Sequence, residues 1–248
     1  MTARDATGGA DTTVRGATGT LLAIDTATSR AVLALGAADG TLLAADTWPA
    51  GHRHVEELLP RLEALLAGHG WDRGALSGLA GVVVGTGPGG FTGLRVGLAT
   101  AKALAVAFRL PLVAIGSGVA LLAAAEAADP ATDGRRLVLL LPAGPSGRYL
   151  VTRAGTQLVI GAELPDLPAD AVIVAVDLAG RAPGAAVARG DAATDRLPGV
   201  MLRLGAVRLA AGDSEDPAQV VPEYVTLPRG VPTATGAEEG VTWSPVRP

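Results

Sequence analysis

The sequence contains no cysteine, and this absence removes several kinds of chemistry at once. Disulfide bonds, a thiolate nucleophile and zinc sites built on thiolates are all excluded. Aromatic residues make up only 3% of a chain that is 49% hydrophobic, so the core has to be built from Ala, Val and Leu. Few aromatic rings also leave few surfaces on which unpaired bases can stack, which argues against direct binding of single-stranded nucleic acid.

Histidines and clustered basic residues are scarce as well. The three histidines are His52, His54 and His69, and their spacing matches neither HxxxH nor HExxH, so we expect no metal site. No G-x-S-x-G turn is present to carry a serine nucleophile, and we expect no catalytic residue in this chain. The net charge is −4 without a run of Lys or Arg, so a role with RNA would have to run through a partner protein.

Long apolar runs are also missing from the sequence. The first residues hold no apolar stretch of the signal-peptide type. Later apolar stretches are interrupted by Gly, Pro or charge before they reach the roughly 18 residues that a membrane span needs. These features predict a cytoplasmic chain that does not interact with membranes.

What is present is a regular alternation of strand and helix patterns. A turn at Asp39-Gly40 separates two short strands and predicts a hairpin. The order β-β-β-α-β-α-β-α predicts an α/β sheet with helices on its faces. The predicted strands cover residues 21–25, 31–36, 41–47, 79–84 and 110–115, and the predicted helices residues 54–67, 92–108 and 119–128.

The pattern weakens in the second half of the chain. Residues 137–141 and 149–153 predict a strand pair that opens a second subdomain, and residues 171–176 predict a further strand. The Ala/Gly/Pro-rich stretch up to Gly212 is ambiguous, and the role of residues 155–215 stays open. The predicted domain organisation is a disordered leader (1–19), an N-terminal subdomain (20–109), a C-terminal subdomain (110–232) and a disordered tail (233–248).

A glycine-rich turn, residues 85–95, joins a predicted strand to a predicted helix. Gly85, Gly87 and Gly90 match the dinucleotide fingerprint G-x-G-x-x-G. Against that interpretation, the next strand ends at Ile115 without the acidic residue that the fingerprint requires, and Pro88 removes a backbone donor. The plainer interpretation is a tight reversal in which glycines allow a close backbone approach.

The helix after this turn has an unusually smooth face. Gly93, Gly97, Thr100, Ala101 and Leu104 recur at spacings of three and four residues. Two glycines inside a helix cost stability, so close packing against another helix would be a reason to keep them. Packing against the chain's own sheet is the alternative, and the pattern favours the partner-facing interpretation by a small margin.

Asp25, Thr26 and Thr28 follow the first predicted strand. A carboxylate beside hydroxyl groups there could hold a metal-bound phosphate. The alternative is a local turn in which these side chains satisfy backbone groups.

Together these motifs resemble the bacterial TsaB family. The resemblance lies in Leu22-Ala23-Ile24-Asp25-Thr26-Ala27-Thr28, in the segment from His54 to Pro60, and in Gly87-Pro88-Gly89-Gly90-Phe91-Thr92-Gly93-Leu94-Arg95-Val96-Gly97. A weaker similarity occurs at residues 222–225, which are similar to the family's closing proline-tyrosine strand. Two positions depart from the family pattern. Gly90 replaces the usual serine, and the turn before Tyr149 lacks the usual aspartate.

The resemblance implies an actin-like ATPase or sugar-kinase (ASKHA) fold with two related subdomains. It implies a non-catalytic scaffold that dimerises with a TsaD-type catalytic subunit, together with a TsaE-type ATPase, to make threonylcarbamoyladenosine on tRNA. It also implies tRNA contact only through partners, a homodimer when the chain is alone, and no cofactor except ATP or ADP at the partner interface.

The same resemblance assigns roles to particular residues. Asp25, Thr26 and Thr28 would form a degenerate nucleotide cleft, and bulky side chains at Gly93 or Gly97 would abolish partner binding while the fold survives. A self-standing ATP-binding kinase-like enzyme is the alternative function. The expected partner interface consists of His54, Leu58, Arg61, Gly89, Phe91, Thr92, Gly93, Arg95, Gly97, Thr100, Ala101 and Leu104.

Overall fold

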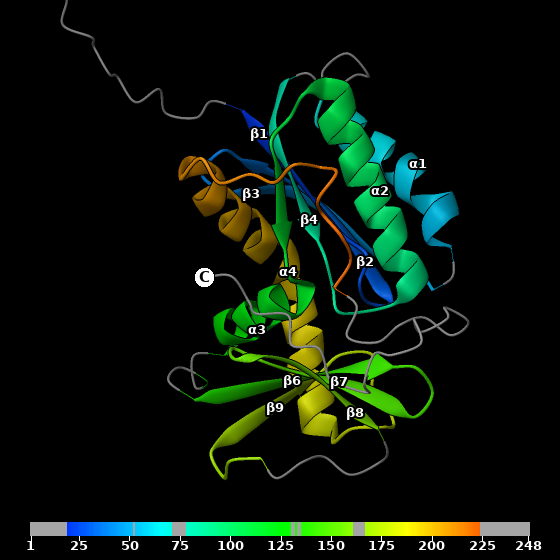
Figure 1. Ribbon diagram of the computed structural model, residues 1–248, viewed down its shortest axis with the longest axis vertical. Coiled ribbons are helices and arrows are strands. Elements are labelled where there is room, and N and C mark those ends of the chain that lie inside the picture. Colours follow the sequence, from blue (N-terminus) through cyan, green and yellow to red (C-terminus); the bar gives the residue numbers. More distant parts are fainter. Residues whose placement is uncertain are drawn as a thin grey trace, which may run out of the picture.

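Two β-sheets with helices between and outside them form the protein (Figure 1). The computed structural model describes residues 19–223 except 52, 71–77, 130–131, 133–134 and 161–166. The predicted leader up to residue 18, the predicted tail, and His52 lie outside the described residues.

The first sheet has five strands and the second has four. In the first sheet the spatial order is β3 (Leu42–Pro49), β2 (Arg30–Ala37), β1 (Thr20–Asp25), β4 (Leu79–Gly85) and β5 (Leu112–Ile115). In the second sheet it is β8 (Gly155–Ile160), β7 (Gly147–Thr152), β6 (Arg136–Ala143) and β9 (Ala171–Ala175). The helices are α1 (His54–Gly68), α2 (Phe91–Phe108), α3 (Ser117–Ala128) and α4 (Gly184–Ala210).

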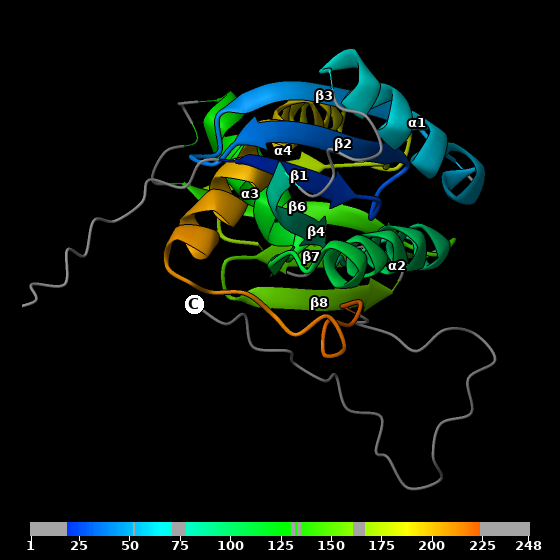
Figure 2. The ribbon, with the colours of Figure 1, turned by 90° about the horizontal axis from the view of Figure 1, so that it is seen from above.

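Alternation along the central strands separates two layers of the core. Leu22 and Ile24 on β1 point into a cluster with the apolar faces of α1 and α2. Leu21 and Ala23 point the other way, into a cluster that also takes in α3, α4 and the inner face of the second sheet. Both faces of β1 are therefore buried, which explains its nearly continuous apolar sequence. Figure 2 shows the same layers from above, with α1 and α2 outside the first sheet.

The predicted order of elements through residue 128 is confirmed, including the hairpin, where Gly40 has a φ of 84°. The predicted boundary between residues 109 and 110 is wrong. β5 pairs in parallel with β4, so the first sheet continues to Ile115, and the change of sheet follows it.

The ambiguous stretch before Gly212 contains α4, a helix of 27 residues. The sequence pattern does not predict this helix, because it contains glycines and Pro198 and both residue types disfavour helix interiors. Gly190 and Gly205 allow close packing. A Cβ at Gly190 would lie 1.9 Å from the carbonyl oxygen of Ala175 on β9, and one at Gly205 would lie 2.2 Å from Val83 on β4. α4 therefore contacts both sheets.

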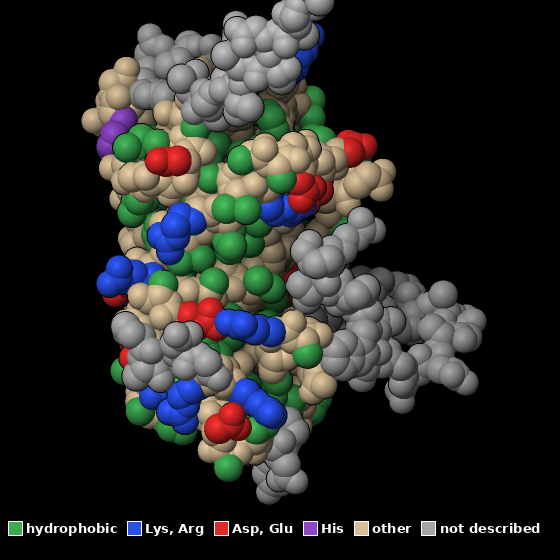
Figure 3. Space-filling model, turned by 90° about the vertical axis from the view of Figure 1, so that its left-hand side faces the viewer, with side chains coloured by type: hydrophobic (Ala, Val, Ile, Leu, Met, Phe, Trp, Pro, Cys, Tyr) green, Lys and Arg blue, Asp and Glu red, His purple; other side chains and the backbone are tan. Residues whose placement is uncertain are grey.

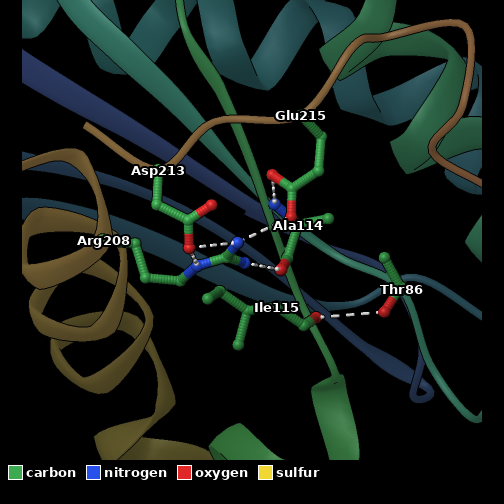
Figure 4. A network of polar contacts seen from close by, with 6 residues as sticks. All are labelled: Thr86, Ala114, Ile115, Arg208, Asp213 and Glu215. Carbon is green, nitrogen blue, oxygen red and sulfur yellow. Dashed lines mark hydrogen bonds and ion pairs between the residues drawn. The ribbon is translucent and has the colours of Figure 1, made fainter. Parts of the chain in front are cut away.

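After α4, residues 211–223, here called the C-terminal strap, return along the free edge of β5. Figure 4 shows the Arg208 guanidinium donating to the Ala114 carbonyl oxygen at 2.8 Å and reaching Asp213 at 2.6 Å and Glu215 at 2.9 Å. The Ala114 amide donates to Glu215 at 3.0 Å. The strap ends at Glu223, whose amide donates to the Thr86 carbonyl oxygen and whose carboxylate accepts from Thr156 of β8. It therefore ties β5, the glycine turn and the second sheet together.

α2 contains 18 residues with a mean hydropathy of 1.3, so by length and composition alone it could cross a membrane. Gly93, Arg95, Gly97 and Lys102 interrupt its apolar sequence, as the sequence-based expectation states. In the structure α2 packs one face on the first sheet through Leu94, Leu98, Ala101 and Ala105, as a core helix of a folded domain does.

The close approach of α4 to β9 predicts opposite effects at two glycines of one helix. Gly190→Ala should lower the free energy of unfolding by about 1–3 kcal/mol, because the added methyl group collides with a backbone carbonyl. Gly199→Ala should raise it by about 0.5–1 kcal/mol, because an Arg203 nitrogen at 3.5 Å is an ordinary van der Waals contact for its Cβ and alanine favours helix. Urea unfolding of both variants measures the difference, and equal stability of the two would contradict this packing.

Candidate functional site

The glycine turn packs against the β1–β2 turn with almost no side chains between them. The Gly87–Pro88 peptide bond is cis, and Gly87 has a φ of 107°. The Gly90 amide donates to the Ala27 carbonyl oxygen at 2.7 Å, and a Cβ at Gly89 would lie 2.0 Å from that same oxygen. The glycines are therefore required for a backbone-to-backbone contact, as the plainer interpretation of the sequence predicts.

Asp25 lies beneath this contact and is almost fully buried. Its carboxylate accepts hydrogen bonds from the Ala27 amide at 2.9 Å and from the Ser117 hydroxyl at 2.6 Å, and that hydroxyl accepts from the Gly87 amide at 3.0 Å. A Cβ at Gly85 would lie 1.8 Å from one carboxylate oxygen. Asp25 thus joins the end of β1, the glycine turn and the start of α3, in agreement with the local-turn interpretation.

Burial raises the pKa of Asp25, while the hydrogen bonds from Ser117 and Ala27 act in the opposite direction. The side chain is enclosed by its own loops, and the described lining of the nearby cleft does not include it. Thr26 is also used internally, since its hydroxyl donates to the Gly93 carbonyl oxygen at 2.7 Å, and Thr28 donates to the Arg30 carbonyl oxygen.

A cleft of about 370 Å³ opens between the two sheets beside these turns. Its walls come from the β1–β2 turn, the glycine turn with the first residues of α2, the end of β6 and the loop after β9. The lining includes Thr26, Thr28, Ser29, His54 and Asp177. No Lys or Arg is among the described residues that line it, so these residues offer no such cation for phosphate groups. Among the described residues we also find no group of three or more acidic or histidine side chains able to hold a metal ion.

The smooth face of α2 points inward, and the partner-facing interpretation of it is wrong. A Cβ at Gly93 would lie 2.3 Å from the Thr26 carbonyl oxygen, and one at Gly97 would lie 2.2 Å from the Thr26 hydroxyl. Ala101 is fully buried in the core. These small residues admit the chain's own β1–β2 turn, so a bulky residue at Gly93 or Gly97 would disturb the fold itself.

Other residues of the expected interface also turn out to be internal. Leu58 is in the core, and His54, expected at the partner interface, is buried with its ring beside Gly93. Arg53 occupies the cap position of α1. Arg61 is half-buried, pairs with Asp46 at 3.0 Å and lies 4.7 Å over the Trp48 ring, so it is tied to β3. Gly89, Thr100 and Leu104 are half-buried.

Exposed members of the expected interface are Phe91, Thr92 and Arg95, with the Arg95 guanidinium 3.7 Å over the Phe91 ring. Large apolar side chains elsewhere on the two helices are strongly exposed as well, with Val55 at 66% near the start of α1 and Val106 at 67% near the end of α2. Sequence analysis missed Val55, Leu59 and Val106, although their spacing from the buried residues of each helix would have indicated them. We call Val55, Leu59, Phe91, Arg95 and Val106 the α1–α2 face.

On the side of the molecule drawn in Figure 3, basic and acidic side chains of the described residues are interspersed. Direct binding of the tRNA backbone usually depends on basic side chains clustered in one patch.

The two sheets, the helices enclosed between them and the cleft at their edge define an α/β protein of the actin-like ATPase and sugar-kinase (ASKHA) fold. YeaZ from Pseudomonas aeruginosa has this architecture, with a TM-score of 0.63 over 83% of this chain and 99% of that one, at 24% identity. The family model described as TsaD, tRNA N6-adenosine threonylcarbamoyltransferase, matches residues 49–198. The chain therefore belongs to this family.

Relatives of known name confirm the resemblance to TsaB. The tRNA threonylcarbamoyladenosine biosynthesis protein TsaB of Escherichia coli is 33% identical over 97 residues, which are 39% of this chain and 40% of that protein. The TsaB protein of Haemophilus influenzae is 35% identical over 106 residues, 43% of each chain. The matched segment thus spans less than half the length of these curated relatives.

The buried carboxyl of Asp25 predicts a particular dependence of stability on pH. Because its folded pKa is raised, the native state keeps a proton that the unfolded chain has lost above about pH 4. The free energy of unfolding should therefore fall as the pH rises from about 4 through the raised pKa. Asp25→Asn has no such proton and should flatten this decline in urea unfolding series.

A control for this prediction is Asp39→Asn. Backbone hydrogen bonding to Thr41 lowers the pKa of Asp39, so its contribution to stability is lost on acidification and lies outside the window above pH 4. Asp39→Asn should leave the decline in place. Parallel profiles for wild type and Asp25→Asn would refute the assignment to Asp25.

Proposed function

We propose that the chain is a non-catalytic subunit that dimerises with a TsaD-type catalytic subunit and thereby supports threonylcarbamoyladenosine modification of tRNA. The observation that carries this proposal is the α1–α2 face, where apolar side chains remain exposed on two adjacent helices that already have a filled inner side. A protein that works alone rarely leaves large apolar side chains so exposed on adjoining helices, and such a surface marks a binding site.

The chemistry of the cleft supports an accessory role over a self-standing ATP-binding enzyme. Asp25 is enclosed in a hydrogen-bond network, Thr26 bonds to α2, and the described cleft lining holds no cation. The catalytic groups and any ATP or ADP would therefore be supplied by the partner or lie at the shared interface. The named relatives act in tRNA threonylcarbamoyladenosine biosynthesis, and this function would place the chain in the cytoplasm.

The remaining partners follow from the same proposal. A TsaE-type ATPase joins the pair, and tRNA is contacted chiefly by the partners, consistent with interspersed charges on the face in Figure 3. Without its partner the chain pairs with a second copy through the α1–α2 face, which buries the same apolar side chains.

A charge placed on this face tests the proposal. Leu59→Asp, at an exposed position of α1, should weaken association with a co-expressed, tagged TsaD-type subunit by at least about tenfold, because a carboxylate would be buried without a partner. Two measurements report the effect: the amount of the chain that co-purifies, and the threonylcarbamoyladenosine content of tRNA from cells that depend on the variant.

Val207→Asp is the matched control, because Val207 is 70% exposed on α4, outside the α1–α2 face. It should bind and support modification like wild type. Light scattering of the isolated chain should show that Leu59→Asp also abolishes the homodimer. Wild-type levels of co-purification and of modified tRNA with Leu59→Asp would refute the proposed docking face.

A further inference from the structure

One carboxylate of this chain already occupies the hydrogen-bond donors at the mouth of the cleft. The Ser29 amide donates to one oxygen of Asp177 at 2.6 Å, and the Ser29 hydroxyl donates to the other oxygen of the same carboxylate. Ser29 belongs to the β1–β2 turn and Asp177 to the loop after β9, so the contact joins residues 148 positions apart in sequence. Both residues line the cleft.

The loop that carries Asp177 is held in place on both sides of it. The Val176 amide donates to the Leu140 carbonyl oxygen of β6 at 3.0 Å, and Leu178 is fully buried in the core of the second sheet. Asp177 itself has a φ of 57°, in the left-handed region that few residues other than Gly, Asn and Asp adopt. The carboxylate is thus presented to Ser29 by a fixed loop.

Charge in the cleft favours the same conclusion. Of the described lining residues, Asp177 is the acidic one, and none is Lys or Arg. Phosphate oxygens and carboxylate oxygens are acceptors of the same kind and prefer the same charge-assisted donors. An incoming polyphosphate would have to displace the carboxylate from Ser29 and then remain beside its negative charge.

We propose that Asp177 is an autoinhibitory contact, an internal anion that fills the anion position at Ser29 and excludes polyphosphates from the cleft. The carboxylate is tethered to the fold, so it competes at a high effective concentration without any loss of translational freedom. This inference concerns the isolated chain and goes beyond the proposed docking function, because it assigns to one residue the rejection of nucleotide-like ligands.

Asp177→Gly removes the carboxylate and keeps a residue that accepts a positive φ. Isothermal calorimetry with inorganic pyrophosphate is the measurement, in the absence of metal ions. Wild type should show no saturable binding. Asp177→Gly should gain saturable binding of pyrophosphate, because the Ser29 donors are released and a like charge is gone.

Asp195→Ala is the matched control, because it also removes one negative charge, here from the neighbouring ion pair between Asp195 and Arg30. Asp195 of α4 pairs with Arg30 at 2.6 Å, one residue beyond Ser29, and its side chain is 70% exposed. This variant leaves the Ser29–Asp177 contact intact and should resemble wild type. Binding by Asp195→Ala equal to that of Asp177→Gly would overturn the proposal, because net charge alone would then explain the gain.

The Ser29 amide proton provides an independent readout by NMR. A short bond to a carboxylate shifts this proton downfield, and Asp177→Gly should remove the shift whether or not a ligand is present. A folded Asp177→Gly with a released Ser29 amide and no pyrophosphate binding would overturn the proposal, and so would saturable binding by wild type. Asp177→Asn, which also tolerates a positive φ, repeats the test with the side-chain volume kept. The calorimetry uses the isolated chain without a TsaD-type subunit. Its outcome is therefore independent of whether the α1–α2 face binds that subunit.

Discussion

The approach of the glycine turn and α2 to the β1–β2 turn is the contact on which the rest of the structure depends. Carbonyl oxygens of Thr26 and Ala27 occupy the space where side chains at Gly93 and Gly89 would lie. The two backbones are in direct contact there, and the buried hydrogen bond from Ser117 to Asp25 lies beneath this contact. Because α2 is seated so deeply on one side, its opposite side and that of α1 are left as a shared outer surface. The position of the α1–α2 face, the proposed docking surface, therefore depends on the absence of side chains beneath α2.

In the glycine turn and the start of α2, residues that pack inside the chain alternate in sequence with residues that are exposed. The segment from Gly87 to Gly97 is the most distinctive part of the sequence, yet most of its small residues serve internal packing. Exposed side chains lie between these small residues in sequence, at Phe91 and Arg95, and on α1 at Val55 and Leu59. The small residues that make this motif distinctive therefore serve packing inside the chain, and the exposed side chains between them are the ones proposed to contact a partner.

Much of the fold could be predicted because the relevant signals are local. The apolar strand at Leu21–Ile24, the turn at Asp39-Gly40 and the four-residue spacing of Leu58 and Leu62 each depend on neighbours along the chain, and the structure confirms all three elements. The use of Asp25 in a local turn belongs to the same group, since the Ala27 amide is two residues away.

What could not be predicted depends on residues far apart in sequence. α4 was missed because Gly190, Pro198 and Gly205 disfavour a helix locally, while tertiary packing on both sheets stabilises one. The direction of the smooth face of α2 could not be read either, since it is set by Thr26, 67 residues before Gly93. Likewise, no local pattern connects Ser29 with Asp177 or Arg208 with Ala114. The family resemblance indicated the fold correctly but could not say which side of α2 is free.

α4 contributes side chains to the cores of both halves of the molecule, so the stability of each half depends on the same helix. At roughly 1.5 Å per residue its 27 residues extend for about 40 Å, far enough to be part of both sheets' cores. Its first turns contact the second sheet and its later turns the first, so neither half retains a complete core once this helix melts. We therefore expect the molecule to unfold in one cooperative transition, in contrast to two-domain chains whose halves melt separately. A cut within α4 would accordingly leave two fragments that regain their structure only by finding each other.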